Sequence, residues 1–331
     1  MSVEALVTFA CFGGDCTLGI AGCGPLGPAA EAVEAVRGTL LGWHRQFSRF
    51  VPDSELSRIN ADPRSTVPAS PLMVELAQAV ATAGKRSGGL VDATLGDAIE
   101  AAGYATHFDG TGIPLRRALA IAPPRHPARR HRDRRWELVH ADPVALTITR
   151  PPGLRLDGGG LAKGLFADVI ARDLGGYQSF VVNLSGDLRL GGSSGARRRV
   201  DIESPFDGAV LHAYSLTEGA VATSGIGRRS WLGPYGVPAH HLLDPSSGRP
   251  AYTGLVQVTA LAPTGLEAEW RSKAALLAGP HAAHARLPHG GLLVFDDERS
   301  ELIAPRAPQR PRVLVSVGPG GRLELSAAPL R

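Results

Sequence analysis

The chain has 331 residues and a mass of 34.6 kDa, enough for one large domain or two of ordinary size. Hydrophobic residues make up 44% and charged residues 20%, which excludes a disordered or collagen-like chain. No apolar run is long enough to span a membrane, and Met1 to Ala10 carries Glu4 and no basic segment. We therefore expect neither a membrane span nor a signal peptide, and a cytoplasmic location.

The chain has a net charge of +4, and its basic residues are divided unevenly between arginine and lysine. Of 35 basic residues, only Lys85, Lys163 and Lys273 are lysines. Because arginine is the default cation of this chain, a retained lysine indicates a position that needs a compact, rotatable ammonium group. Two of the three lysines lie in the motifs described below.

The three cysteines, Cys11, Cys16 and Cys23, all lie near the start of the chain. Three thiols cannot all pair, and their spacing does not match that of a metal site. We interpret them as buried thiols on strands, in a reducing compartment.

The first part of the chain begins with strand patterns and continues with helical ones. Val3 to Ile20 is rich in Val, Thr, Phe and Cys, which predicts two strands joined by a Gly13–Gly14 turn. Apolar residues at helical spacing predict helices over Pro28 to Phe47, Pro71 to Ser87 and Val91 to Ala102, and a short helix within Phe47 to Asn60.

Residues 125–135, RHPARRHRDRR, form the one strong charge run. Such a run can grip phosphate or nucleic acid, but it contains Pro127 and no interleaved aromatic residue. We therefore predict an exposed loop and no nucleic-acid partner.

Strand patterns dominate the rest of the chain. Trp136 to Val139 and Leu146 to Thr149 predict a hairpin that leads to Asp157. Further strands are predicted at Phe180 to Leu184, Leu188 to Gly191, Arg199 to Glu203, Ala213 to Leu216, Val221 to Thr223, Leu255 to Ala262, Gly291 to Phe295 and Val313 to Val317, and helices at Ala162 to Leu174 and Thr264 to Ala278. Because no regular βαβ order emerges, we expect an α+β or mixed α/β fold that is not doubly wound.

The strongest local motif is DGGGLAKG, from Asp157 to Gly164, at a predicted strand-to-helix junction. Glycines let the backbone approach a ligand, and the helix start offers free N–H groups to an anion such as phosphate. Lys163 adds a point charge, but it stands where a dinucleotide motif has its third glycine, and no Walker A pattern is present. The alternative is a plain glycine-rich turn with an exposed lysine.

His241 and Asp244 lie three residues apart before a proline-containing turn. A histidine beside a carboxylate suits an oriented general base or half of a metal site. The alternative is a histidine that packs or caps locally.

Two other motifs are unspecific taken singly. Val221 to Gly225 presents hydroxyl groups, including that of Ser224, before Arg228 and Arg229. Glu269 and Lys273 are four residues apart, so they share a face of the predicted helix, as an ordinary surface ion pair would.

Taken in order, these motifs resemble those of one family, the ApbE-type FAD:protein FMN transferases. The similar blocks are FSRFVPDSELSRIN (47–60), GGLVDATLG (88–96), DGGGLAKG (157–164), VNLSGDLRLGG (182–192), VATSG (221–225), HHLLDPSSGRP (240–250) and APTGLEAEWRSKA (262–274). The resemblance implies an enzyme that cleaves FAD, attaches FMN to a Ser or Thr hydroxyl of an acceptor protein and releases AMP. It also implies a single two-part domain over residues 1–331 with a tunnelling-fold-like portion, in which a smaller mixed subdomain around 28–125 packs on the main part.

The resemblance assigns roles to particular residues. The residues at family positions that contact FAD are Phe12, Phe50, Leu90, Val91, Asp92, Asp157, Gly160, Lys163, Ser224 and Leu243. The residues at family positions that hold Mg²⁺ are Gly160, through its backbone, Glu269, Ser272 and Lys273. His241 is expected by this resemblance to help deprotonate the acceptor hydroxyl. From the residues themselves we expect Asp244 to orient His241 and Lys273 to act in catalysis.

The expected metal motif is altered. Glu269 replaces the usual aspartate, Lys273 the usual threonine and Gly160 a polar residue. A charged ammonium cannot ligate Mg²⁺ and repels it. Our hypothesis is that Lys273, paired with Glu269, replaces Mg²⁺ as counter-charge for the phosphates, with a surviving Mg²⁺ site on Glu269 and backbone carbonyls as the alternative. The altered motif also leaves open a flavin-binding protein or flavin-dependent redox enzyme that has lost transfer.

Overall fold

An eight-stranded antiparallel sheet forms the centre of the computed structural model, which describes residues 3–107, 112–233, 236–306, 313–317 and 323–327. Along the sheet the strands are β1 (Glu4–Cys11), β2 (Gly14–Ala21), β8 (Ser179–Leu184), β9 (Asp187–Gly191), β12 (Gly219–Gly225), β17 (Leu255–Ala262), β18 (Gly291–Phe295) and β19 (Ser300–Ile303). Every neighbouring pair is antiparallel. The expected α+β fold that is not doubly wound is therefore confirmed.

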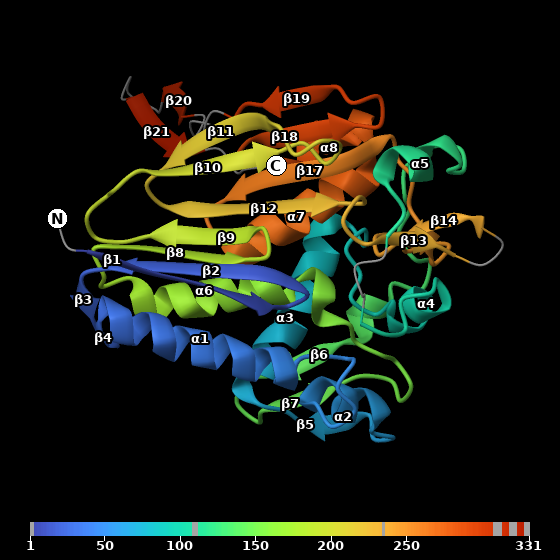
Figure 1. The fold of residues 1–331 in the computed structure, drawn as a ribbon, viewed down its shortest axis with the longest axis horizontal. Coiled ribbons are helices and arrows are strands. Elements are labelled where there is room, and N and C mark those ends of the chain that lie inside the picture. The colour runs from blue at the N-terminus through green and yellow to red at the C-terminus, as the bar shows by residue number, and fades with distance from the viewer. Residues whose placement is uncertain (1–2, 108–111, 234–235, 307–312, 318–322, 328–331) are drawn as a thin grey trace.

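Three helices cover one face of this sheet: α1 (Ala29–Gln46), α6 (Ala162–Leu174) and α7 (Gly265–Ala278) (Figure 1). Helix α1 packs on β1 and β2, α6 on β8 and β9, and α7 on β12 and β17. Their apolar faces and the strands enclose a core that includes Leu18, Leu40 and Phe166. The burial of this apolar surface is the main force that holds the layers together.

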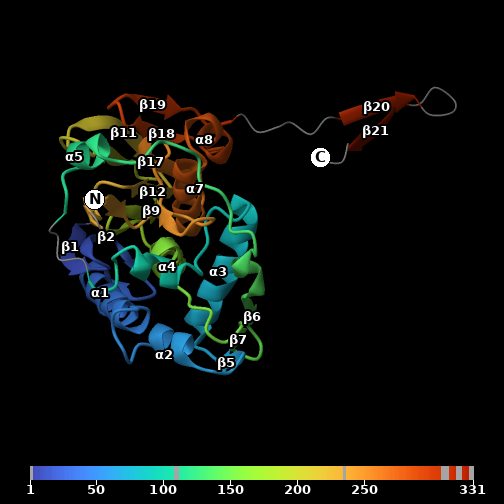
Figure 2. The same cartoon turned by 90° about the vertical axis from the view of Figure 1, so that its right-hand side faces the viewer.

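A further layer lies beyond these helices. It consists of α3 (Pro71–Ser87) and a small sheet of β5 (Thr66–Pro68), β7 (Thr147–Thr149) and β6 (His140–Asp142), which lie beside one another in Figure 2. Local sequence defines the ends of α3: the Ser70 hydroxyl accepts a hydrogen bond from Met73 N at 3.4 Å, Pro71 occupies the first turn, and Gly88 ends the helix with a φ of 70°.

The remaining elements are short. They are β3 (Cys23–Gly24), β4 (Gly27–Pro28), α2 (Glu55–Ala61), α4 (Gly96–Ala101), α5 (Leu115–Ala120), η1 (Arg135–Leu138), η2 (Gly158–Gly160), β10 (Arg198–Glu203), β11 (Val210–Leu216), β13 (Ser230–Leu232), β14 (Pro238–His240), β15 (Leu243–Asp244), β16 (Arg249–Pro250), α8 (Pro280–Arg286), β20 (Val313–Val317) and β21 (Leu323–Ala327). None of the helices among the described residues is long and apolar enough to cross a membrane.

Two predicted elements are wrong. The helix predicted over 91–102 shrinks to α4, because Asp92 Oδ1 accepts hydrogen bonds from the backbone N and the hydroxyl of Thr94 and fixes a turn. Trp136 to Val139 is not a strand: residues 135–138 form the 3₁₀ helix η1, and Trp136 is buried against Gly84 of α3. An added Cβ on Gly84 would lie 2.3 Å from the indole, so this contact requires glycine.

The cysteine and loop predictions are mostly confirmed. Cys11 and Cys16 are buried thiols on the main sheet, whereas Cys23 is exposed on the two-residue strand β3, outside that sheet, so the expectation of burial is wrong for it. Residues 125–134 form a largely exposed loop, as predicted.

Candidate functional site

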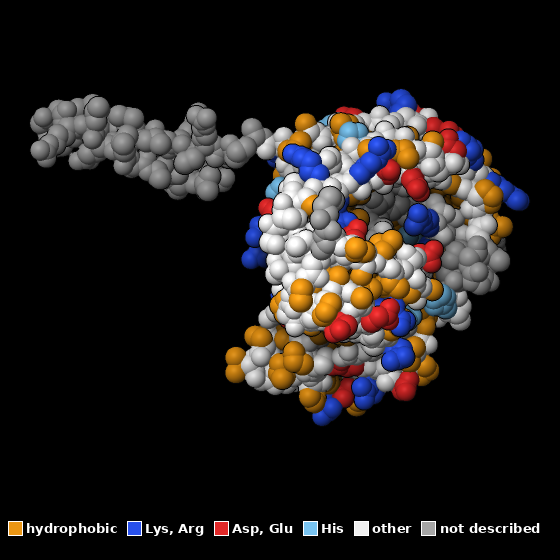
Figure 3. Space-filling model, turned by 60° about the vertical axis from the view of Figure 1, so that its left-hand side comes forward, with side chains coloured by type: hydrophobic (Ala, Val, Ile, Leu, Met, Phe, Trp, Pro, Cys, Tyr) orange, Lys and Arg blue, Asp and Glu red, His pale blue; other side chains and the backbone are white. Residues whose placement is uncertain are grey.

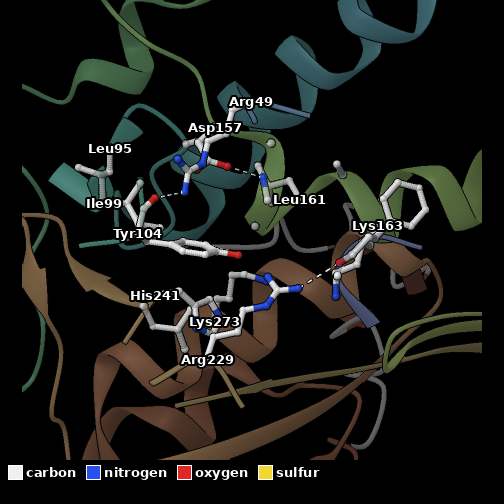
Figure 4. A pocket seen from close by; sticks show the side chains of 18 of the residues that line it. Arg49, Leu95, Ile99, Tyr104, Asp157, Leu161, Lys163, Arg229, His241 and Lys273 are labelled. Carbon is white, nitrogen blue, oxygen red and sulfur yellow. Dashed lines mark hydrogen bonds and ion pairs between the residues drawn. The ribbon is translucent and has the colours of Figure 1, made fainter. Parts of the chain in front are cut away.

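A pocket lies where the glycine-rich loop, the start of α6 and the side of α7 face the α1–α2 connection and the segment around α4. Its wall brings together residues far apart in the chain, from the β1–β2 turn, the end of α1, the segment around α4, the glycine-rich loop and α7 (Figure 4). Of the predicted site residues, those that line it are Phe12, Phe50, Leu90, Val91, Asp92, Asp157, Gly160, Lys163, His241, Leu243 and Lys273. The space-filling view shows a hollow on one face, bordered by basic and acidic side chains (Figure 3).

The glycine-rich loop is held by its own first residue. Asp157 Oδ1 accepts a hydrogen bond from Gly159 N at 2.7 Å, which caps the short helix η2 before α6 begins. Lys163 follows in the first turn of α6, and its Nζ lies 2.5 Å from Asp187 Oδ2. Burial opposes the charged form of Lys163, but the carboxylates of Asp187 and Glu269 outweigh it and raise the pKa. Lys163 is therefore a fixed cation beside the loop.

The opposite wall carries an arginine that packs against two aromatic rings. The Arg49 guanidinium carbon lies 4.2 Å from the centroid of the Phe50 ring and 4.8 Å from that of Tyr104. Its Nε also lies 3.1 Å from Asp157 Oδ2, which ties the α1–α2 connection to the glycine-rich loop. Arg49 and Tyr104 were not among the predicted site residues, although Arg49 belongs to the FSRF block.

Helix α7 contributes a buried ion pair. Glu269 is 0% exposed; its Oε2 accepts a hydrogen bond from Gly164 N at 2.8 Å, and its Oε1 lies 3.2 Å from Lys273 Nζ. Burial raises the pKa of Glu269, and the charge of Lys273 opposes that effect. Glu269 is therefore the partner that fixes the Lys273 ammonium at the pocket wall.

Ser224 and Ser272 do not line the pocket. Their hydroxyls are 2.8 Å apart in a buried contact between β12 and α7, and the Ser272 hydroxyl also donates to Glu269 O at 3.0 Å. These groups satisfy each other's hydrogen-bonding needs, so their burial has a local explanation.

The side chains expected at a Mg²⁺ site do not suit that ion. Both carboxylate oxygens of Glu269 already have N–H partners, and the neighbouring group is an ammonium, which has no lone pair to give. Mg²⁺ needs near-octahedral oxygen ligands. No group of three or more His, Cys, Asp or Glu in the described parts of the chain is arranged to hold a metal.

His241 lines the pocket beside Arg229 and Lys273 (Figure 4). Its Nδ1 is buried and has no hydrogen-bond partner among the residues that the structure describes. Burial, reinforced by the positive charge of Arg229, holds the pKa of His241 well below its ordinary value of 6.5. The imidazole is therefore neutral near pH 7, the form that can accept a proton.

Asp244 does not orient His241, and that prediction is wrong. Its Oδ1 accepts hydrogen bonds from Arg129 N at 2.9 Å and Ser246 N at 3.0 Å, and the Ser246 and Ser247 hydroxyls also donate to the carboxylate. The carboxylate thus stabilises the turn that follows it and binds the exposed loop of residues 125–134 to this turn. It does not line the pocket.

A family model described as the ApbE family matches residues 12–293. The chain belongs to the ApbE family. The family predicted from the motifs is thereby confirmed, and the match spans the pocket-lining segments and the main sheet from β2 to β18, without the edge strands β1 and β19.

Individual ApbE relatives cover most of the chain. A protein of Klebsiella pneumoniae (strain 342) named FAD:protein FMN transferase is 28% identical over 275 residues, 80% of this chain and 77% of the relative. One of the same name from Escherichia coli (strain K12) is 26% identical over 274 residues, 81% and 76% of the two chains.

Solved structures show the same fold. The ApbE protein of Thermotoga maritima superimposes with a TM-score of 0.74 at 23% identity, over 91% of this chain and 97% of that one. Apo flavinyl transferase ApbE of Pseudomonas stutzeri gives 0.71 at 25% identity, over 91% and 95%.

Proposed function

We propose that this ApbE-family chain is an FAD:protein FMN transferase. It cleaves FAD, attaches FMN to a Ser or Thr hydroxyl of an acceptor protein and releases AMP. The observation that carries the proposal is that one pocket combines a capped glycine-rich loop, fixed cations and a neutral histidine, in a chain whose relatives bear that name.

The two sides of the pocket suit the two kinds of surface on FAD. Leu95, Ile99 and Tyr104 offer apolar and aromatic surface toward one side, which suits a ring system (Figure 4). Lys163 lies toward the other side, and the glycine-rich loop runs from Asp157 toward it. Together they offer positive charge and backbone N–H groups to the pyrophosphate. We assign flavin and phosphate contact to these two sides.

The reaction is an in-line displacement at phosphorus. The acceptor hydroxyl oxygen bonds to the phosphorus of the FMN half, the bond from that phosphorus to the bridging oxygen breaks, and AMP leaves with the bridging oxygen. His241 takes the hydroxyl proton, because its imidazole is neutral and lines the pocket. The cations at the glycine-rich loop stabilise the charge that develops on the phosphate oxygens.

A mass-shift assay tests the proposal. The protein is incubated with FAD and an acceptor domain that carries a Thr-containing flavinylation motif, and a family enzyme of ordinary metal motif serves as positive control. The expected result is an FMN-sized mass gain on the acceptor with one AMP released per transfer. Flavin that stays bound without any gain, while the control enzyme modifies the same acceptor, would instead identify a flavin-binding or redox protein.

A further inference from the structure

On the wall opposite Arg49, three cationic side chains of the described residues line the pocket: Lys163, Arg229 and Lys273 (Figure 4). Each is held by a different acceptor. Lys163 lies 2.5 Å from Asp187, Lys273 lies 3.2 Å from Glu269, and an Arg229 terminal nitrogen donates to Phe12 O at 3.0 Å. These three cations face the carboxylates of Asp187 and Glu269, while Asp157 of the loop is paired with Arg49 on the opposite wall. Among the described residues this wall therefore carries excess positive charge, as an anion site requires.

Lys273 and Gly160 fit each other sterically. A Cβ at position 160 would lie 3.2 Å from Lys273 Cε and 3.6 Å from its Cδ. The shorter distance is tighter than ordinary van der Waals contact, so a larger side chain at position 160 would displace the lysine stem. Glycine at 160 therefore makes room for the lysine that crosses beside the loop.

The position of the ammonium is fixed by the helix that carries it. Lys273 and Glu269 are one turn apart on α7, and Gly164 N holds the second carboxylate oxygen. The Lys273 side chain is only 13% exposed, so its charge is weakly screened by solvent. Because the ammonium is already held in place, little free energy is spent on reorganising it when an anion binds.

We propose that Lys273, held by Glu269 and accommodated by Gly160, supplies the fixed positive charge that a divalent metal would otherwise bring to the FAD pyrophosphate. FAD then binds this pocket without a divalent cation. This inference rests on the proposed function because it requires that the pocket binds FAD. It adds that a side chain, Lys273, balances the negative charge of the pyrophosphate.

The first experiment measures FAD binding to the intact protein, by quenching of flavin fluorescence, in EDTA and in excess Mg²⁺. No acceptor protein is present, so the result is independent of transfer activity. Equal affinities, within about twofold, are expected in the two buffers because the site's cation is covalently part of the chain. An affinity at least about tenfold weaker in EDTA would overturn the inference even if transfer in Mg²⁺ is normal.

The second experiment removes the ammonium with Lys273→Met. Loss of one charge-assisted contact is expected to weaken FAD binding in EDTA by about tenfold to a hundredfold. The matched control is Lys85→Met, at an exposed position of α3 outside the pocket, which should bind FAD as the unmodified protein does. Unchanged FAD affinity in Lys273→Met would overturn the inference.

Two further comparisons separate a charge effect from a packing effect. Lys273→Met leaves Glu269 buried without its cation, so the double variant Glu269→Gln/Lys273→Met provides a neutral pair of similar size that should fold. Riboflavin, which lacks phosphate, should bind all variants equally, whereas FAD should discriminate among them. Equal weakening of riboflavin and FAD would assign Lys273 a merely structural role and overturn the inference.

Discussion

At the scale of single residues, His241 is the group whose environment most directly affects chemistry. Its pKa lies well below 6.5 because the imidazole is buried beside Arg229, so protonation sets in only when the pH falls far below that value. We therefore expect kcat/KM for FMN transfer to lack an acid limb near pH 6.5, and His241→Ala to lower it by about 10²- to 10⁴-fold. A pH–rate profile from 5 to 8 checks this, and a limb centred near 6.5 would contradict it.

For Asp244 we expect a substitution to lower stability and to leave the pH dependence of the reaction unchanged, because its carboxylate holds a turn together. Asp244→Ala leaves Arg129 N and Ser246 N without their acceptor, so we expect the free energy of unfolding to fall by roughly 1–3 kcal/mol. Urea denaturation measures this loss, with Asp173→Ala on the exposed surface of α6 as control. The shape of the pH–rate profile should not change. A shifted profile in Asp244→Ala would show that the carboxylate acts on His241 after all.

The sequence predicted which residues line the pocket better than what each of them does. Spacing placed Asp244 three residues from His241, but it gave no information on which way the carboxylate points after a turn through Pro245. Arg49 was missed because its neighbour Phe50 was the more obvious ligand contact, and the guanidinium meets Tyr104 and Asp157 only after distant segments fold together. Such long-range contacts leave no local pattern in the sequence.

At the scale of elements, errors in prediction arose where tertiary contacts overrode local pattern. The pattern around Trp136 resembles that of a strand. In the structure the Trp136 indole packs against Gly84, and the backbone around it forms the 3₁₀ helix η1. The helical periodicity after Val91 is interrupted by a turn, in which the Thr94 backbone N donates a hydrogen bond to Asp92 Oδ1, two residues earlier. Long amphipathic helices such as α1 and α3 were predictable because their burial pattern repeats over several turns.

The close approach of α6 and α7 depends on a pair of glycines. A Cβ on Gly164 would lie 2.4 Å from Gly265 O and 2.7 Å from Leu266 N, both backbone atoms that cannot move aside without shifting the helix. We expect Gly164→Ala to cost roughly 1–3 kcal/mol of unfolding free energy through this clash. It should also weaken FAD binding, because α6 carries Lys163.

The matched control for this variant is Gly38→Ala. Gly38 lies within α1, and no atom of the described part of the chain is within 4 Å of an added Cβ. There alanine should stabilise the protein by roughly 0.5–1 kcal/mol, because it restricts the unfolded chain more than glycine does. Chemical denaturation of both variants tests the pair, and equal stabilities would refute the proposed role of the close helix contact.

At the scale of the whole molecule, one large apolar core joins several parts of the chain that surround the pocket, and a second lies along β17, β18 and β19. The large core includes Leu18 of the main sheet, Leu40 of α1, Leu76 of α3, Phe166 of α6 and Trp270 of α7. The segment around 28–125, expected from the sequence as a smaller subdomain, thus shares its buried surface with the sheet and its helices. Shared burial of this kind favours unfolding as a single unit.

Thermal unfolding with and without FAD tests this cooperation. We expect one transition, and because ligand binds only the folded state, FAD at about 100 times its Kd should stabilise the whole unit by about 2.7 kcal/mol. Calorimetry would then show a single peak that moves up in temperature as FAD is added. Two separate peaks, of which FAD moves only one, would mean that the helical segment and the sheet unfold independently despite their common core. The pocket would in that case be an interface between two folding units, and its ligand would stabilise that interface rather than the molecule as a whole.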